Sequence, residues 1–185
     1  MHLITVVVAQ EDFEAALVEL RGDVYRHFFR ARRLVIGEVL RLVDGKGRAR
    51  RATVSEISGS SAIVQTAELL PSNEPPLRLE ILVPVPRPPR LSWLVEKCTE
   101  LGVAAIRLIN CERAGRTIGS GALERLRRVA KSAVEQSNRA TVPEISGIHQ
   151  WTELRHMLSH CQGSLFMVPS GSDRGVDEAF ESISL

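Results

Sequence analysis

The sequence predicts an α+β protein of two regions, a small β-barrel followed by an α/β domain built on a parallel sheet. Three observations lead to this class: short β-branched runs separated by glycine turns in the first seventy residues, a proline-rich segment at 71–76, and alternating strand and helix patterns after it. We therefore predict a barrel domain over residues 1–72 and an α/β domain over residues 77–185. With 185 residues, the chain is long enough to bury a core in each.

The first region is predicted to contain short strands and one helical segment. Its strands are predicted at Leu3–Val8, Val39–Val43, Ala49–Ile57 and Ala62–Thr66. Asp44-Gly45 is a strong β-hairpin signal, and Ser58–Ser60 supplies a second glycine turn. Between the first two strands, Asp23–Leu34 is predicted to be helical. Short strands joined by glycine turns favour a small barrel.

After the proline-rich segment, apolar residues recur with the periods of buried strands and amphipathic helices. Strands covered on both faces are predicted at Leu79–Val85, Ala104–Ile109 and Ser164–Val168. Helices are predicted at Leu91–Leu101, Leu123–Val134, Trp151–Leu158 and Val176–Phe180. Gly102 stands where a helix-capping glycine belongs. This alternation implies a parallel sheet with right-handed crossovers. The prolines predict that few contacts cross a boundary near residue 74.

The net charge of +2 conceals a strongly basic segment. Residues 21–51 contain ten Arg or Lys residues against three Asp or Glu residues, so this segment carries +7 and the rest of the chain −5. An excess of this size indicates a polyanionic partner such as nucleic acid, because phosphate binding releases condensed counterions. A solvated basic face on a small barrel is the alternative.

Several classes of protein are disfavoured by what the sequence lacks. It contains neither GxGxxG nor GxxxxGK[ST] nor a Gly-x-Ser-x-Gly elbow, which argues against common nucleotide hydrolases and serine hydrolases. The three cysteines are widely spaced and the five histidines show no metal-site spacing, so we predict neither disulfides nor a metal. Without a leader or an apolar run of membrane-spanning length, a cytoplasmic location and no membrane partner are expected.

Polar residues gather at the ends of two predicted helices. One group is Glu96–Val103, and the other is Glu135–Arg139, which Val142–Ile145 follows. Packing alone does not require so many polar residues at these positions. Because ligands of open α/β sheets usually bind outside the carboxyl ends of the strands, we expect both groups to contribute to a site there. Ordinary helix-end polarity, with Arg139 complementing the helix dipole, is the alternative.

Together with these helix ends, several residues of the first region form a recognisable set. The set comprises Arg26-His27, Arg33, Gly37, Asp44-Gly45, Lys97–Val103, Glu112-Arg113, Glu135–Arg139 and Val142–Ile145. In order and spacing, it resembles the ribosomal RNA small subunit methyltransferase E family of the SPOUT superfamily. The resemblance implies a PUA-like RNA-binding β-barrel and a SPOUT-type α/β domain that binds S-adenosylmethionine. It also implies methylation of N3 of a uridine in small-subunit (16S) ribosomal RNA by a homodimer.

The resemblance further implies roles for individual residues. Contacts to RNA are expected from Arg26, His27, Arg30, Arg32, Arg33, Arg113 and Arg116. The expected catalytic residues, which shape the site where the N3 proton leaves an extruded uridine, are Glu135, Gln136 and Arg139. Cofactor contacts are expected from Val168, Pro169 and Ser170. For Arg113 and Arg116, plain surface charge is the alternative.

The sequence departs from the family pattern near its end. Members carry a Gly-Pro-Glu-Gly-Gly segment and a later Leu-Gly…Ile-Leu-Arg segment that form the knot, and neither occurs before Leu185. We therefore expect a truncated knot region and an incomplete cofactor pocket in this chain. The alternative function is a non-catalytic RNA-binding protein that lost the cofactor-binding knot. Retention of Glu135, Gln136 and Arg139 favours the enzyme, whereas the absence of the glycine-rich knot segment favours the RNA-binding protein.

Overall fold

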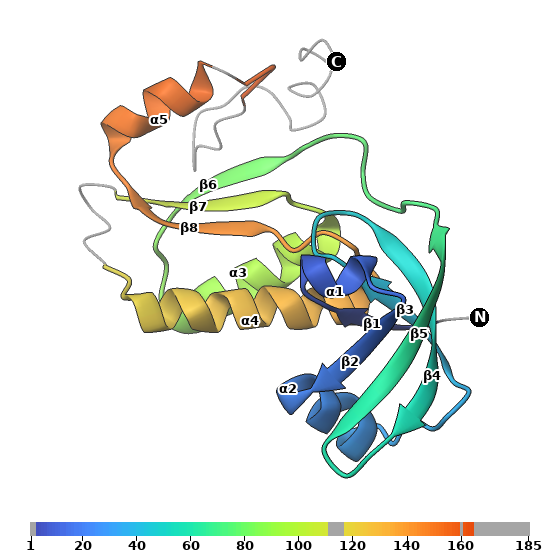
Figure 1. Cartoon of the computed structure of the whole chain (residues 1–185). Helices are drawn as coiled ribbons and strands as arrows, with labels where there is room; N and C mark the ends of the chain where they lie inside the picture. Colours follow the sequence, from blue (N-terminus) through green and yellow to red (C-terminus); the bar gives the residue numbers. More distant parts are fainter. Residues whose placement is uncertain (1–2, 111–116, 160, 165–185) are drawn as a thin grey trace.

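Two β-sheets, one after the other along the chain, form the framework of the molecule (Figure 1). The computed structural model describes residues 3–110, 117–159 and 161–164. The first sheet precedes the proline-rich segment and the second follows it, as the sequence predicts. No helix within these described ranges is long and apolar enough to cross a membrane.

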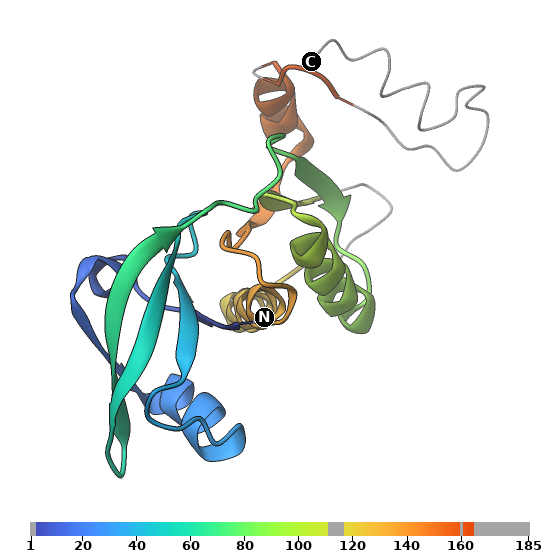
Figure 2. The ribbon, with the colours of Figure 1, turned by 90° about the vertical axis from the view of Figure 1, so that its right-hand side faces the viewer.

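The first sheet is mixed and strongly curled (Figure 2). Its strands are β1 (Ile4–Val7), β2 (Leu17–Arg21), β3 (Val39–Val43), β4 (Ala49–Ile57) and β5 (Ser61–Leu70). They lie in the order β1-β3-β4-β5-β2, with β1 parallel to β3 and every other pairing antiparallel. Since β1 and β2 form the two edges in the described part of the chain, the predicted barrel is realised as a half-barrel.

Short helices cover the half-barrel. They are α1 (Gln10–Glu14), α2 (Gly22–Tyr25) and the π-helix η1 (Arg26–Ala31), which continues α2. The last two confirm the helical prediction for Asp23–Leu34. Neither α1 nor β2 is predicted from the sequence, because each has only five residues. The apolar core of this region includes Phe13, Val18, Leu20, Phe28, Leu40 and Val64.

The second sheet is parallel, with helices packed against it. Its strands, in spatial order, are β6 (Glu80–Pro84), β7 (Ala105–Ile109) and β8 (Glu144–His149). The helices are α3 (Pro88–Leu101), α4 (Ser120–Ser137) and α5 (Trp151–Leu158). In Figure 1, α3 and α4 lie side by side beneath the sheet, and their apolar faces close the second core.

The described part of the second sheet contains one strand that the sequence does not predict, β8. The predicted strand Ser164–Val168 lies outside the described residues except for Ser164, which has no regular structure, so it stays a prediction. The predicted helix at Val176–Phe180 also lies outside them. Ser146 and Gly147 interrupt the apolar pattern of β8, which explains why the sequence does not reveal it as a buried strand.

The direction of the strands fixes where the helix ends lie. In each β-α-β unit the helix begins near the carboxyl end of one strand and ends near the amino end of the next. The C-terminal ends of α3 and α4 therefore lie at the amino-end edge of the parallel sheet, where the half-barrel also sits (Figure 1). The expectation that Glu96–Val103 and Glu135–Arg139 line the crevice outside the carboxyl ends is wrong, because both groups occupy the opposite edge.

The two regions are also packed against each other. A small apolar cluster joins them, formed by Val7, Val43, Ala49, Val134 and Ala140. The N–H of Val142 donates to the carbonyl of Gly45 at 2.8 Å, which adds a backbone link. The expectation of few contacts near residue 74 is therefore wrong. We retain 1–72 and 77–185 as the proposed domain bounds, with a substantial junction between them.

Candidate functional site

The helices α2 and η1 and the two residues that follow them, together called the α2–η1 segment, carry five predicted RNA-binding side chains. These exposed side chains belong to Arg26, His27, Arg30, Arg32 and Arg33. Phe28 within this run, Tyr25 before it and Leu34 after it are buried in the core of the half-barrel, so they anchor the segment. Its cationic side therefore faces outward.

Few of these cations are neutralised by carboxylates. Arg26 forms an exposed ion pair with Asp23, and among the described residues no other member of the segment has a carboxylate oxygen within 4.0 Å. Arg30 donates to the carbonyl of Gly59 at 2.7 Å. The guanidinium of Arg32 lies 5.6 Å from the ring centroid of Phe28, which holds it at the surface without neutralising it. The segment thus presents uncompensated positive charge.

Arg139, a predicted catalytic residue, lies instead at the centre of the junction. It is 7% exposed. Its Nε lies 3.1 and 3.2 Å from the two carboxylate oxygens of Glu74, to which its Nη2 also donates. Its Nη1 donates to the carbonyl of Thr99 at 3.4 Å. Arg139 therefore connects the proline-rich segment to the end of α3.

Glu74 binds more than one partner in this junction. Its Oε1 also accepts the backbone N–H groups of Ala140 at 2.6 Å and Thr141 at 3.1 Å. Burial alone would raise the pKa of Glu74, but the hydrogen bonds from Arg139 and Ala140 outweigh burial and hold this pKa below its ordinary value. The carboxylate is therefore ionised in the folded protein at neutral pH, and it fixes the turn between α4 and β8.

Arg41 is a second buried cation at the same place, supplied by the half-barrel. It is 8% exposed, and its Nη1 donates to the carbonyls of Asn138 at 2.7 Å and Arg139 at 3.1 Å. Its Nη2 donates to Oδ1 of Asn73 at 2.8 Å. Asn138 has φ of 56° and ends α4, while its side chain accepts the Thr5 hydroxyl at 2.7 Å. Arg41 thus satisfies carbonyls at the negative end of the α4 dipole.

Gly102 confirms its predicted role as the cap of α3 and also makes room for this junction. Its φ is 98°, in the left-handed region. A Cβ at this position would come within 3.0 Å of Nη1 of Arg139 and of Cγ of Pro75. Only glycine meets both requirements without strain.

The other predicted catalytic residues lie near the junction in different environments. Glu135 is half-buried, and its Oε1 accepts the N–H of Val7 at 3.4 Å. Burial raises the pKa of Glu135, although the Val7 N–H and the nearby charges of Lys131 and Arg32 oppose this rise. Gln136 is exposed. Of the three, Gln136 is the one whose side chain is open to a ligand.

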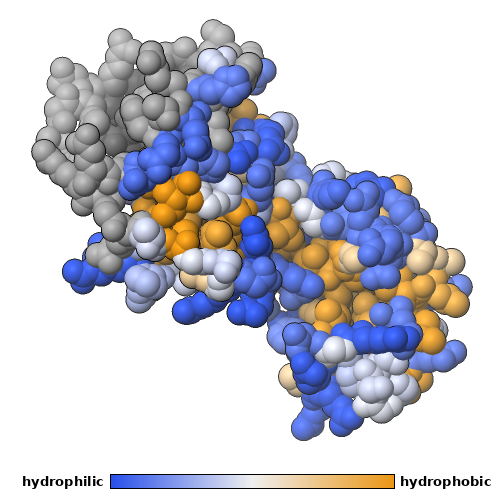
Figure 3. Space-filling view, turned by 60° about the vertical axis from the view of Figure 1, so that its left-hand side comes forward, coloured by the Kyte–Doolittle hydropathy of each residue, from blue (hydrophilic) through white to orange (hydrophobic). Residues whose placement is uncertain are grey.

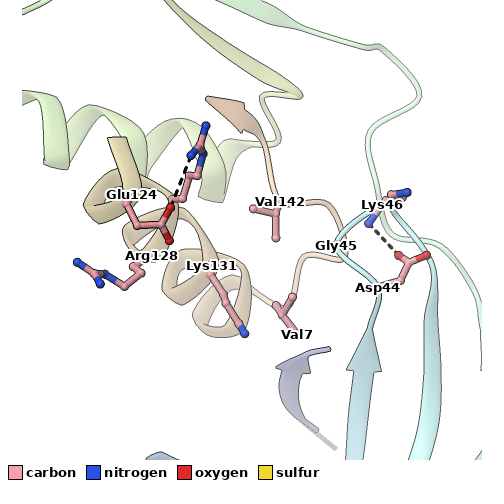
Figure 4. Close-up of a pocket in the computed structure, with 9 residues that line it drawn as sticks. Val7, Asp44, Gly45, Lys46, Glu124, Arg128, Lys131 and Val142 are labelled. Atoms are coloured by element: carbon pink, nitrogen blue, oxygen red, sulfur yellow. Dashed lines mark hydrogen bonds and ion pairs between the residues drawn. The ribbon is translucent and has the colours of Figure 1, made fainter. Parts of the chain in front are cut away.

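An open groove separates α4 from the β3–β4 turn, with a volume of about 470 Å³. The cations that line it are Lys46, Arg127, Arg128 and Lys131. Figure 4 shows α4 on one side, Lys46 on the other, and Val7 and Val142 between them. Lys46 belongs to the basic segment at 21–51 for which the sequence predicts a polyanionic partner. Its position opposite Arg127, Arg128 and Lys131 is not predicted, because residues about eighty positions apart meet only through the docking of the two regions.

The remaining predicted site residues cannot be placed in this geometry. Arg113, Arg116, Val168, Pro169 and Ser170 lie outside the described residues. The described residues contain no group of three His, Cys, Asp or Glu side chains that could hold a metal ion. Sequence analysis also missed Glu74 and Arg41. An arginine inside the apolar strand Val39–Val43 was an available signal, since such a residue requires buried acceptors.

Comparison with known families agrees with this two-part architecture. Residues 73–184 match the model of an RNA methyltransferase domain, and residues 20–66 match an RNA methyltransferase PUA domain. The first match alone covers more than half of the 185 residues.

Individual relatives also carry the name of an RNA methyltransferase. Over 141 residues the chain is 29% identical to the ribosomal RNA small subunit methyltransferase E of Synechocystis sp., which covers 76% of this chain and 46% of that protein. It is 31% identical over 140 residues to the protein of the same name from Mycobacterium bovis, covering 72% of this chain and 52% of the relative. The chain therefore spans about half the length of these relatives.

The fold has a matching solved structure. The crystal structure of a ribosomal RNA small subunit methyltransferase E from Neisseria gonorrhoeae, bound to S-adenosyl methionine, superposes with a TM-score of 0.76 and 27% identity. The match covers 83% of this chain and 64% of that one. The chain belongs to the RNA methyltransferase family, and its relatives there are named ribosomal RNA small subunit methyltransferase E.

Proposed function

We propose that this chain serves the S-adenosylmethionine-dependent methylation of N3 of a uridine in small-subunit ribosomal RNA. One observation carries the proposal: the region that matches a PUA domain presents the exposed cations of α2–η1, and it is docked on a region that matches a methyltransferase domain. The names of the relatives and the cofactor in the Neisseria structure support the substrate and the methyl donor.

The chemistry defines what the protein must provide. N3 lies on the base-pairing edge of uridine, so the base must be unpaired or extruded before it can react. The N3–H proton must leave, which requires an acceptor or a nearby cation for the developing anion. S-adenosylmethionine supplies an electrophilic methyl group on a sulfonium. The protein therefore acts chiefly by positioning the base and excluding water.

The described residues contribute to the first of these tasks. Arg30, Arg32 and Arg33 fix the RNA backbone by contacts that carry no sequence information. Contact of Val168, Pro169 and Ser170 with the cofactor stays a prediction, because they lie outside the described residues.

Catalytic roles for Glu135, Gln136 and Arg139 also stay predictions. Arg139 is engaged with Glu74 and Thr99, so we propose that it acts by positioning. Gln136 is exposed, which suits direct contact with RNA. If Gln136 touches the reacting base, Gln136→Ala lowers the rate of methyl transfer while RNA affinity stays the same. Ser132→Ala, at another exposed position of α4, is the matched control. Equal rates for both variants would remove Gln136 from the reaction.

We further propose a cytoplasmic homodimer. Trp93 and Leu101, two turns apart on α3, are 64% and 80% exposed, which is typical of a surface covered by a partner. In the view of Figure 3, hydrophobic residues gather into a patch on each half of the molecule. Sedimentation of the purified chain tests the dimer, and a monomer at all concentrations would contradict it.

The function is tested by incubating the purified chain with S-adenosylmethionine carrying a tritiated methyl group and an unmodified small-subunit ribosomal RNA transcript. We expect tritium in the RNA and a single new stop of reverse transcriptase, because a methyl on N3 blocks base pairing. RNA binding without transfer, together with no heat of cofactor binding in calorimetry, would instead support the alternative of a non-catalytic RNA-binding protein.

A further inference from the structure

The groove between α4 and the β3–β4 turn carries an excess of positive charge that the fold does not use. Two carboxylates line it, but both are already engaged. Asp44 is buried and accepts from Nε of Arg48 at 2.8 Å and from the Lys46 N–H at 2.8 Å. Glu124 lies 3.6 Å from Arg127.

Three cations of the groove form no ion pair in the described part of the chain. Within the described part of the chain, no carboxylate oxygen lies within 4.0 Å of Lys46, Arg128 or Lys131. Lys46 donates to the neutral amide of Gln10 at 2.5 Å, and Arg128 is exposed. Like charges repel one another across a groove, and a bound anion would relieve this repulsion.

One cation of the groove and one that follows η1 act on the same carboxyl group. Burial raises the pKa of Glu135, and the charges of Lys131, from α4, and Arg32, the residue after η1, oppose this rise. The apolar side chains of Val7 and Val142 form the floor between the two walls, where sugars and bases could rest (Figure 4).

We propose that this groove is a second RNA-binding surface, in which Lys46, Arg128 and Lys131 contact consecutive phosphates of a strand that leaves the α2–η1 segment. The inference rests on the proposed function and extends it, since it makes the RNA span both regions. Such a strand would be held on each side of the junction formed by Glu74 and Arg139, so the RNA would reach the methyltransferase region in a fixed direction.

The test measures binding of a fluorescein-labelled oligouridylate over a series of salt concentrations by anisotropy. The double variant Arg128→Gln, Lys131→Gln removes two groove charges. We expect the slope of log K against log salt to fall by about 1.4, which corresponds to about 25-fold weaker binding near 0.1 M salt. Glutamine is a good helix former, so α4 should stay folded, as circular dichroism can verify.

The matched control is Arg90→Gln, Arg125→Gln, which removes two exposed charges outside the groove. A groove variant that behaves like this control would overturn the inference. If Arg30→Gln, Arg33→Gln flattens the slope while the groove variant does not, the proposed RNA binding stands and the groove inference fails. If the unmodified chain does not bind RNA at all, both fail. Equal competition by a polyglutamate peptide would show recognition of charge alone and would also overturn the assignment to RNA.

Discussion

In the α2–η1 segment the arginines are exposed and largely lack carboxylate partners, whereas at the junction Arg41 and Arg139 are 8% and 7% exposed and donate to several acceptors. The two groups share one side-chain type and lie in one small molecule. Their surroundings differ in burial and in the number of oxygen atoms within hydrogen-bonding distance. This difference makes the junction arginines structural, while the exposed ones stay available to a ligand.

Burial also separates Arg139 from the other two predicted catalytic residues. Arg139 was grouped with Glu135 and Gln136 by its place in one motif, yet its guanidinium is held by Glu74, sixty-five positions earlier in the chain. Membership of a sequence motif therefore does not show whether a residue contacts a ligand or holds the two regions together.

The largest expected effect comes from breaking the junction. Arg139→Ala leaves the buried carboxylate of Glu74 without its cation, and we expect the free energy of unfolding to fall by about 3–4 kcal/mol. Arg32→Ala, at an exposed position, should change it by less than about 0.5 kcal/mol. Urea titrations of both variants give the comparison. Equal losses would show that burial does not separate the two groups of arginines.

The next largest loss of stability is expected at Gly102, where the absence of a Cβ makes room for the Arg139 side chain. Gly102→Ala places a methyl group against the guanidinium and requires a left-handed backbone, so we expect a loss of about 2–3 kcal/mol. The control is Gly121→Ala in α4, where a Cβ meets nothing within 4 Å. This control should be neutral or slightly stabilising. An unchanged midpoint for Gly102→Ala would mean that Arg139 is not packed as described.

The junction should also weaken in acid. The pKa of Glu74 is lower in the folded protein than its ordinary value of 4.5, so its contribution to stability is complete above that pH. As the pH falls through the folded-state value, the contribution is lost, and we expect a change of about 1–2 kcal/mol. Unfolding measured between pH 7 and pH 3 tests this, with Glu74→Gln as the variant whose curve should be flatter. Parallel curves would contradict the ionised pair.

The smallest effect has the opposite sign. Burial raises the pKa of Glu135, so its ionised form is disfavoured in the folded state, and stability falls as the pH rises through the folded-state pKa. Glu135→Gln should therefore stabilise the protein at pH 7 by up to about 1 kcal/mol and lose this advantage in acid. Glu124→Gln, at an exposed position, is the control. A destabilised Glu135→Gln variant would mean that the carboxylate is required at the junction.

Sequence patterns predicted most of the fold because strong periodicity leaves few alternatives. The apolar stripes of α3 and α4 and the Asp44-Gly45 hairpin were found close to their observed bounds. Short or interrupted elements such as β2 and β8 were missed, because propensity over five or six residues is weak. The edge at which α3 and α4 end was also assigned wrongly, because a helix that connects parallel strands ends near the amino end of the next strand.

The sequence predicts candidate site residues only where they lie close together in one segment of the chain. The exposed cations from Arg26 to Arg33 lie together in sequence, so composition revealed them as a candidate RNA surface. The groove and the junction combine residues from both regions, including Lys46 with Arg128 and Glu74 with Arg139. Such pairings depend on how the regions dock, which periodicity does not encode.

The proposed RNA binding depends most directly on the exposed arginines, and the salt dependence of RNA binding by Arg30→Gln, Arg33→Gln measures their role. If these side chains hold phosphates, the slope of log K against log salt should fall by about 1.4 relative to the unmodified chain. Parallel lines for the two proteins would contradict this role, because they would show that the exposed cations of the half-barrel do not contact RNA.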